Sequence, residues 1–125
     1  MSLRLREYRV VDLPAIHAIN EAAYPAVGTE TLDDLGDIAA ESVIALVADD
    51  ESAAADDATA IAGFCLVLAP GARYDSMNYL WFADRYDDFV YLDRVAISPA
   101  HQRRGLGRMM YAEVERLAAE RRPGA

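Results

Sequence analysis

The chain of 125 residues has no lysine, only one cysteine and two histidines, and no long hydrophobic run. A single cysteine excludes an internal disulfide, and two distant histidines disfavour a structural zinc site. Without lysine, a Walker-type phosphate loop is excluded. The apolar runs are far shorter than the ~20 residues of a membrane span, and the N-terminus lacks a signal-peptide core. We therefore expect a soluble, cytoplasmic protein that binds no metal and no membrane.

Charge is unevenly distributed along the chain. All twelve basic residues are arginine, and 21 acidic residues give a net charge of −9. This balance disfavours generic binding to nucleic acid. Residues 94–125 hold seven arginines and three acidic residues, whereas residues 1–93 hold five and eighteen. Such a concentration of arginine favours a small anion as ligand, with a solvated helix face as the alternative.

Apolar periodicity predicts one α/β (α+β) domain over residues 1–125. Strands are expected over residues 3–10, 42–48, 61–68 and 89–97, and helices over residues 13–24, 32–40 and 105–121. Asp12 and Thr31 are expected to cap the first two helices. The acidic residues 49–57 indicate an exposed turn, and Cys65 is expected in the core. The predicted order is therefore β-α-α-β-β-β-α.

Residues 69–88 lack strand periodicity and are rich in aromatic side chains. Long loops in small domains are usually functional or disordered, and the aromatic content disfavours disorder. We predict a partly helical lid or substrate wall, with a hydrophobic plug over the sheet as the alternative.

The segment FVYLDRVAISPAHQRRGLGRMMY, residues 89–111, combines a strand, a short loop and the start of an amphipathic helix. The first turn of a helix presents unpaired N–H groups and partial positive charge, which attract phosphate. Gly105 and Gly107 allow close approach to the backbone, and the neighbouring arginines add charge-assisted contacts. His101 is expected at the rim of this phosphate site.

The sequence QRRGLG after VAISP resembles the acetyl-CoA signature of the GNAT superfamily of N-acetyltransferases. Residues 68–99 are similar to a bacterial GNAT subgroup of unassigned substrate. The resemblance covers the whole chain. It implies a mixed, mostly antiparallel central sheet flanked by helices, and acetyl transfer from acetyl-CoA to a primary amine of a small molecule or protein. An α/β domain whose helix merely begins with glycines is the alternative.

The resemblance also implies where the cofactor binds. In the family the loop and helix start bind the CoA pyrophosphate through backbone amides, and the preceding strand pairs with the pantetheine arm. The cofactor-binding residues carried over are Val95, Ala96, Ile97, Gln102, Arg103, Arg104, Gly105, Leu106, Gly107 and Arg108.

For catalysis, a group must take a proton from the amine. Alternation of side chains along a strand places Tyr91, Asp93 and Val95 on one face. Asp93 is the candidate base and Tyr91 lines the same face; an ion pair of Asp93 with Arg94 or another arginine is the alternative. Aromatic and acidic side chains suit a cationic acceptor. The expected substrate-binding residues are Glu21, Tyr24, Tyr74, Asp75, Asn78, Tyr79 and Trp81.

A GNAT domain normally continues beyond this helix with a fifth strand, a further helix and a closing hairpin. The sequence ends at Ala125, so we expect these C-terminal elements to be lacking here. An exposed edge on strand 89–97 would then favour a homodimer. Two other functions stay open: a non-catalytic acyl-CoA-binding module, and a dimerisation module whose arginine loop binds another phosphorylated ligand.

Overall fold

A computed structural model describes residues 3–50, 61–69, 91–102 and 105–120. Its regular elements follow the predicted order. They are β1 (Leu3–Glu7), α1 (Leu13–Ala22), α2 (Leu32–Glu41), β2 (Ile44–Asp50), β3 (Ile61–Leu68), β4 (Tyr91–Ile97) and α4 (Leu106–Glu120). Two short 3-10 turns, Val10–Asp12 and Pro99–His101, precede α1 and α4 respectively. The predicted lid residues 70–88 lie outside the described residues.

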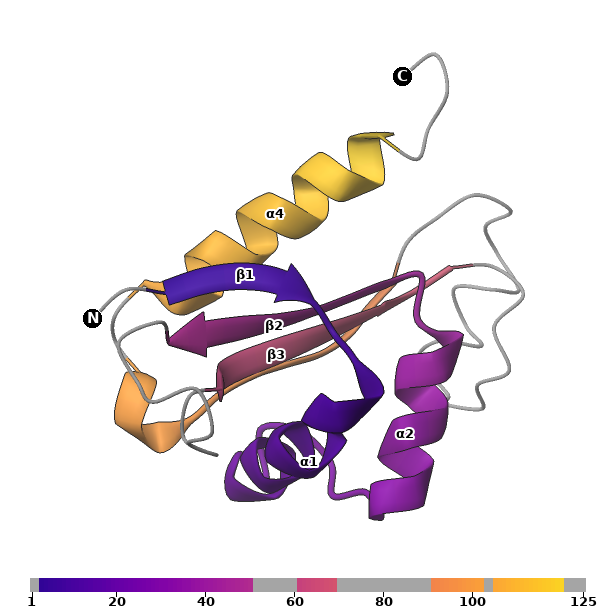
Figure 1. Ribbon diagram of the computed structural model, residues 1–125, viewed down its shortest axis with the longest axis vertical. Helices are drawn as coiled ribbons and strands as arrows, with labels where there is room; N and C mark the ends of the chain where they lie inside the picture. Colours follow the sequence, from indigo (N-terminus) through magenta and orange to yellow (C-terminus); the bar gives the residue numbers. More distant parts are fainter. Residues whose placement is uncertain (1–2, 51–60, 70–90, 103–104, 121–125) are drawn as a thin grey trace.

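The strands form one antiparallel sheet in the order β1-β2-β3-β4. Helices α1 and α2 cover one face of this sheet and α4 covers the other (Figure 1). This arrangement confirms the predicted sheet flanked by helices. In the described part of the chain, β4 has a strand on one side only. None of the helices within these residues is long and apolar enough to cross a membrane.

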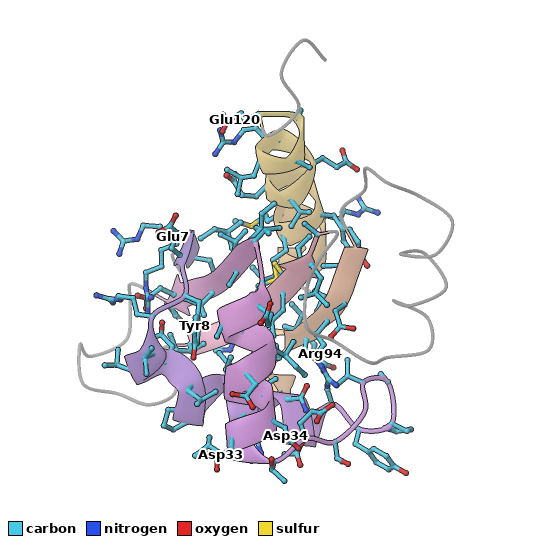
Figure 2. All side chains as sticks on the ribbon, turned by 90° about the vertical axis from the view of Figure 1, so that its right-hand side faces the viewer. Glu7, Tyr8, Asp33, Asp34, Arg94 and Glu120 are labelled. Carbon is cyan, nitrogen blue, oxygen red and sulfur yellow. The ribbon has the colours of Figure 1, made fainter. Side chains whose placement is uncertain are left out.

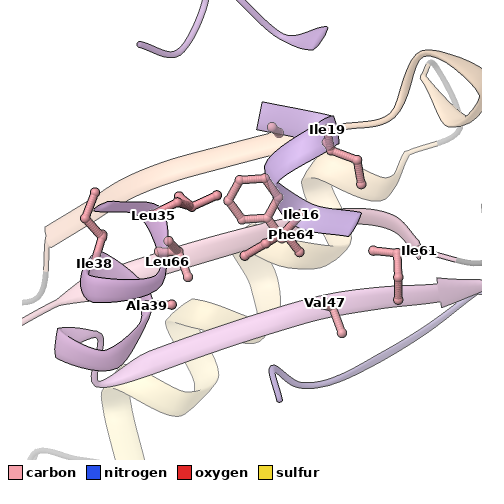
Figure 3. Packing of buried hydrophobic residues seen from close by; sticks show 10 residues of the cluster. Ile16, Ile19, Leu35, Ile38, Ala39, Val47, Ile61, Phe64 and Leu66 are labelled. Atoms are coloured by element: carbon pink, nitrogen blue, oxygen red, sulfur yellow. The ribbon is translucent and has the colours of Figure 1, made fainter. Parts of the chain in front are cut away.

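The core has two layers that share β3, whose eight residues are all buried. Phe64 packs with Ile16 of α1 and Leu35 of α2 on one face (Figure 3). On the other face, Cys65 belongs to a cluster with Met110 of α4. Burial raises the pKa of the Cys65 thiol to about 11, which confirms a core residue and disfavours a nucleophile.

The two predicted helix caps have different outcomes. The Thr31 hydroxyl accepts a hydrogen bond from the Asp34 N–H at 3.1 Å, as predicted for the cap of α2. Asp12 occupies the cap position of α1, but its carboxylate caps nothing there. It accepts instead from the Arg6 guanidinium and from the Arg9 N–H. Burial alone would raise the pKa of Asp12, but these hydrogen bonds hold it below its ordinary value. The capping prediction for Asp12 is wrong.

A β-bulge interrupts β4 at Asp93. Leu66 of β3 pairs with Arg94 and its neighbour Val67 pairs with Leu92, so Asp93 is the extra residue. Consequently Leu92 and Val95 both pack on the α4 side of the sheet. The prediction that strict alternation places Asp93 and Val95 on one face is therefore wrong. The side chain of Tyr91 is not described.

The acidic run at the end of β2 also differs from the prediction. Asp49 and Asp50 belong to β2 rather than to an exposed turn, and Asp50 is buried. Asp49 accepts a hydrogen bond from Arg6 Nε at 3.1 Å, and Asp50 contacts His101. Paired carboxylates tolerate burial, and a sequence pattern cannot show the partners. The remaining acids of that run fall outside the described residues.

Candidate functional site

Helix α4 begins at an open glycine turn. Gly105 has φ +77°, in the left-handed region that favours glycine, and its carbonyl accepts from the Met109 N–H. A Cβ placed on Gly105 or Gly107 would meet no described atom within 4 Å. Protein packing therefore does not require glycine at position 107. The first turn of a fifteen-residue helix is left accessible, with its unpaired N–H groups and positive dipole end.

Three other predicted cofactor residues are described near this turn. The side chain of Leu106 is buried in the core, so only its backbone is available to a ligand. Arg108 is exposed on the first turns of α4, and Gln102 is exposed and donates to the Ile97 carbonyl at 3.4 Å. Arg103 and Arg104 are outside the described residues.

The end of β4 leads into this turn. Val95, Ala96 and Ile97 pair through their backbones with β3. Ala96 is buried under α1 and α2, while Val95 and Ile97 pack toward α4. Within the described ranges, the opposite backbone edge of β4 carries no strand. An edge strand that ends at an open helix start presents backbone groups to an extended ligand carrying a diphosphate.

The described residues around this turn fit such a ligand. The helix N-terminus, the open glycine positions and the exposed Arg108 all favour an anion. Among the described residues, no three histidine, cysteine, aspartate or glutamate side chains are grouped to hold a metal ion.

A second polar region lies beside the bulge of β4 and centres on Arg94. Its buried guanidinium donates through Nη1 to Asn20 Oδ1 at 2.9 Å and to the Gly28 carbonyl at 2.7 Å. Nη2 pairs with the Glu30 carboxylate. Arg94 therefore attaches the segment between α1 and α2 to β4 (Figure 2).

Asp93 forms an ion pair with Arg94, at 3.3 Å between Oδ2 and Nε, and its side chain is 6% exposed. The ion-pair alternative is therefore what the structure contains. The role of Asp93 as a base stays a prediction.

Two further carboxylates share the same neighbourhood. Glu21 Oε2 accepts from Asn20 Nδ2 at 2.9 Å and from the Glu30 N–H at 3.2 Å, and these hydrogen bonds lower the pKa of Glu21. Burial raises the pKa of Glu30; the carboxylates of Asp34, Asp93 and Glu21 raise it further, and Arg94 only partly offsets them. Among the described residues, the carboxylates around Glu30 therefore outnumber the one guanidinium that pairs with it.

This excess of negative charge borders a pocket of about 470 Å³. Carboxylates, hydroxyls and one imidazole line it: His17, Glu21, Thr29, Glu30, Thr31 and Asp34. Tyr24, predicted to bind substrate with Glu21, is 64% exposed just beyond α1. Five predicted substrate residues cannot be placed because they fall outside the described ranges: Tyr74, Asp75, Asn78, Tyr79 and Trp81.

A different, apolar pocket of about 540 Å³ opens between α1 and the turn after β4. Ala15, Ala18 and Ile19 line it on one side, and Ser98 and His101 on the other. His101 was expected at the rim of a phosphate site, but its side chain is buried and that prediction is wrong.

Sequence reasoning missed Asn20 as well as the burial of Arg94 and Asp50. Polar residues usually indicate surface, and their partners here come from distant segments. Nothing in the local sequence distinguishes them from exposed polar residues.

The profile of a protein family described as the acetyltransferase (GNAT) family matches residues 13–125. No curated protein sequence matches the chain. Several solved structures share its fold.

The ribosomal-protein-S18-alanine N-acetyltransferase from Escherichia coli superposes with a TM-score of 0.67 at 16% identity, over 96% of this chain and 61% of that one. Arabidopsis thaliana NAA60 in complex with a bisubstrate analogue gives 0.68 at 18% identity, over 93% and 66%. A GNAT family acetyltransferase from Brucella melitensis in complex with acetyl-CoA gives 0.61 at 21% identity, over 99% and 71%. The chain thus spans between three fifths and three quarters of the length of these proteins.

Proposed function

Because the chain belongs to the acetyltransferase (GNAT) family, we propose that it transfers an acetyl group from acetyl-CoA to a primary amine. The observation that carries the proposal is the open glycine start of α4 at the end of an edge strand. That combination offers a diphosphate the backbone N–H groups that it requires.

In this proposal the diphosphate lies against the backbone from Gly105 to Gly107, with Arg103, Arg104, Arg108 and Gln102 around it. The pantetheine arm runs along the edge of Val95, Ala96 and Ile97 that faces away from β3. Acetyl-CoA, once bound, supplies an activated acyl group. The protein's part is to orient the thioester carbonyl and to receive the proton that the amine releases.

The acceptor amine approaches from the region around Arg94 and the acidic pocket. An alkylamine is mostly protonated at neutral pH, so excess negative charge at Glu21 and Glu30 attracts it. Asp93, at the bulge of β4, takes a proton from the bound ammonium so that the neutral amine can attack the thioester carbonyl. As the N–C bond forms the C–S bond breaks, and the CoA thiolate leaves with the second amine proton as the free thiol. Tyr91 and Tyr24, together with the predicted lid residues Tyr74, Asp75, Asn78, Tyr79 and Trp81, complete the acceptor side.

The test is release of free CoA thiol from acetyl-CoA in the presence of an amine, with the acetylated product identified by mass. Two amine probes represent the two acceptor classes: kanamycin for small molecules and a peptide with a free N-terminal alanine for proteins. The proposal expects amine-dependent thiol release with one probe. Binding of acetyl-CoA without turnover of either class would instead indicate an acyl-CoA-binding module.

Among the described residues no strand pairs with the outer edge of β4, and this also supports the dimerisation alternative, since such an edge can accept a strand from a second copy. A partner strand and the pantetheine arm would compete for the same backbone groups. Sedimentation with and without acetyl-CoA distinguishes cofactor binding from dimerisation at this edge. A dimer that binds no acetyl-CoA and is not dissociated by it would favour the dimerisation module.

A further inference from the structure

Three side chains form a hydrogen-bonded chain at one end of the sheet. His101 Nε2 lies 3.2 Å from Asp50 Oδ2, and His101 Nδ1 lies 2.6 Å from Ser98 Oγ. His101 and Asp50 are both buried, and Ser98 lies partly exposed at the exit of β4. Motif analysis did not connect these residues, because Asp50 is separated from His101 by 51 positions.

The donors and acceptors of Ser98, His101 and Asp50 indicate where the protons lie. A carboxylate only accepts hydrogen bonds, so Asp50 requires the proton on His101 Nε2. Nδ1 of the neutral ring is then an acceptor, and the Ser98 hydroxyl donates to it. The Ser98 hydroxyl therefore donates to His101, and His101 donates to Asp50. A fully satisfied buried chain restricts the positions of the groups that it joins.

The hydrogen bonds of His101 also connect the turn after β4 to β2. Asp50 ends β2, β3 begins at the same end, and β4 leaves the sheet there. The turn after β4 is held to β3 by the Ser98 N–H, which donates to the Ala62 carbonyl at 2.8 Å. The contact of His101 with Asp50 extends this attachment to β2, one strand further into the sheet. The turn that leads to α4 is thus held at several points.

We propose that Asp50 and His101 are positioning residues for acetyl-CoA: they fix the turn after β4 so that the start of α4 meets the diphosphate. The inference rests on the proposed function, because it assumes that the open start of α4 is the diphosphate site. Neither side chain touches the ligand. They act through Ser98 and the turn, which sets where the backbone N–H groups of α4 point.

The experiment measures the dissociation constant for CoA by calorimetry, and thermal unfolding of each variant. His101→Leu and Asp50→Ala break the chain, and both are expected to weaken CoA binding on the order of 10- to 100-fold, the usual penalty for a misplaced binding group. Ser98→Ala removes only the link nearest the turn and is expected to weaken binding several-fold. It is the variant that keeps the test valid where the loss of a buried partner prevents folding.

Asp49→Ala is the matched control. Asp49 is the neighbouring residue on β2 and also pairs with a cation, but its partner is Arg6 of β1 rather than the turn after β4. The control is expected to lose stability and keep the wild-type affinity for CoA. A general loosening of the fold would lower both quantities in both aspartate variants.

Asp50→Asn is the conservative rescue. An asparagine can donate to His101 Nε2 while Nδ1–H donates to Ser98, so the chain is restored in the reverse direction. We expect CoA affinity close to that of the wild type for Asp50→Asn and clearly weaker affinity for Asp50→Ala. A structural role in which only the charge of Asp50 matters would make the two variants alike and would overturn the inference.

The outcomes separate the inference from the proposed function. Absence of CoA binding by the wild type overturns both. Wild-type binding that His101→Leu, Asp50→Ala and Ser98→Ala leave unchanged overturns this inference alone. A loss in the Asp49→Ala control as large as that in Asp50→Ala also contradicts it, because the effect would then not depend on the turn.

Discussion

Two polar regions of opposite character lie along β4 and just beyond it. In the middle of the strand, Arg94 is buried, and among the described residues the carboxylates near it outnumber its single charge. Beyond the end of the strand, hydrogen bonds among Ser98, His101 and Asp50 hold a turn whose helix start presents backbone N–H groups. The first region is built from charged side chains and suits a cation, whereas the second is built from backbone and suits an anion. One strand thus separates the two reactants that the proposed reaction must bring together.

Removal of the buried Arg94 guanidinium is expected to have the largest effect on stability. Arg94→Met removes the cation that pairs with the Glu30 carboxylate, which should cost about 3–5 kcal/mol of unfolding free energy, as for other broken buried ion pairs. It also releases the Gly28 carbonyl, so the segment between α1 and α2 loses its attachment to β4. Urea denaturation measures the loss, and amine-dependent thiol release should fall with it.

Arg6→Met is the matched control, because Arg6 is also partly buried and pairs with Asp12 and Asp49 at the other edge of the sheet. We expect it to lose stability in the same range. Below the unfolding temperature of both variants, only Arg94→Met should lose turnover. Equal turnover in the two would contradict a role for the Arg94 region in acceptor binding.

The start of α4, which suits an anion, is tested by adding a negative charge there. Gly107→Glu places a carboxylate where the diphosphate should lie, and like-charge repulsion should weaken acetyl-CoA binding at least ~100-fold, or about 3 kcal/mol. Stability should not fall, because a Cβ has space there and glutamate is favoured over glycine in the first turn of a helix.

Ala112→Glu adds the same charge to an exposed position further along α4 and should leave acetyl-CoA affinity within about twofold of the wild type. Calorimetry measures both variants. If Gly107→Glu binds acetyl-CoA as the wild type does, the diphosphate is not at the start of α4.

Asp93 belongs to the Arg94 region, and its predicted role as base is tested by pH. Asp93→Asn should lower turnover near neutral pH about 100-fold, the usual contribution of a general base, with acetyl-CoA affinity unchanged. At high pH the amine has already lost its proton, so the defect should shrink. A loss as large at high pH as at neutral pH would show that Asp93 only orients Arg94.

The smallest effects are expected from the two glutamates, which should have opposite signs. The pKa of Glu30 is raised by burial and neighbouring carboxylates, so the folded state holds its proton more tightly than the unfolded chain. The wild type therefore gains stability from this group as pH falls through the folded pKa toward the unfolded one. Glu30→Gln should be slightly more stable than the wild type at neutral pH, by less than about 1 kcal/mol, and lose this advantage in acid.

The pKa of Glu21 is lowered by its hydrogen bonds, so its contribution is present above the unfolded pKa and lost as pH falls through the folded one. Glu21→Gln should be less stable than the wild type at neutral pH, with the difference vanishing in acid. Urea denaturation between about pH 7 and pH 3 measures both variants. If the difference in unfolding free energy from the wild type changes with pH in the same direction for both variants, the assigned directions of the two pKa shifts are contradicted.

The sequence predicts the elements well where a regular pattern determines them. Residues 61–68 form β3 with the predicted bounds, because an apolar run of that length suits a strand buried on both faces. The helix predicted over residues 105–121 begins at Leu106, directly after Gly105, because an apolar stripe at helical spacing determines it.

The sequence does not predict the partners of the buried polar residues in the two regions along and beyond β4. The bulge at Asp93 comes from the pairing with β3, and the burial of Arg94 comes from the segment between α1 and α2 that covers it. The same reason explains Asp50, whose acidic neighbours indicate an exposed turn until His101 is placed against it. These contacts are long-range, and no local pattern encodes them.

Calorimetric titration with acetyl-CoA tests the central claim most directly, with dephospho-CoA as a second ligand that keeps the diphosphate. Saturable binding at one site is expected for acetyl-CoA, and measurable binding at the same site is expected for dephospho-CoA. Absence of binding by both ligands would contradict the assignment of the open start of α4 as a diphosphate site.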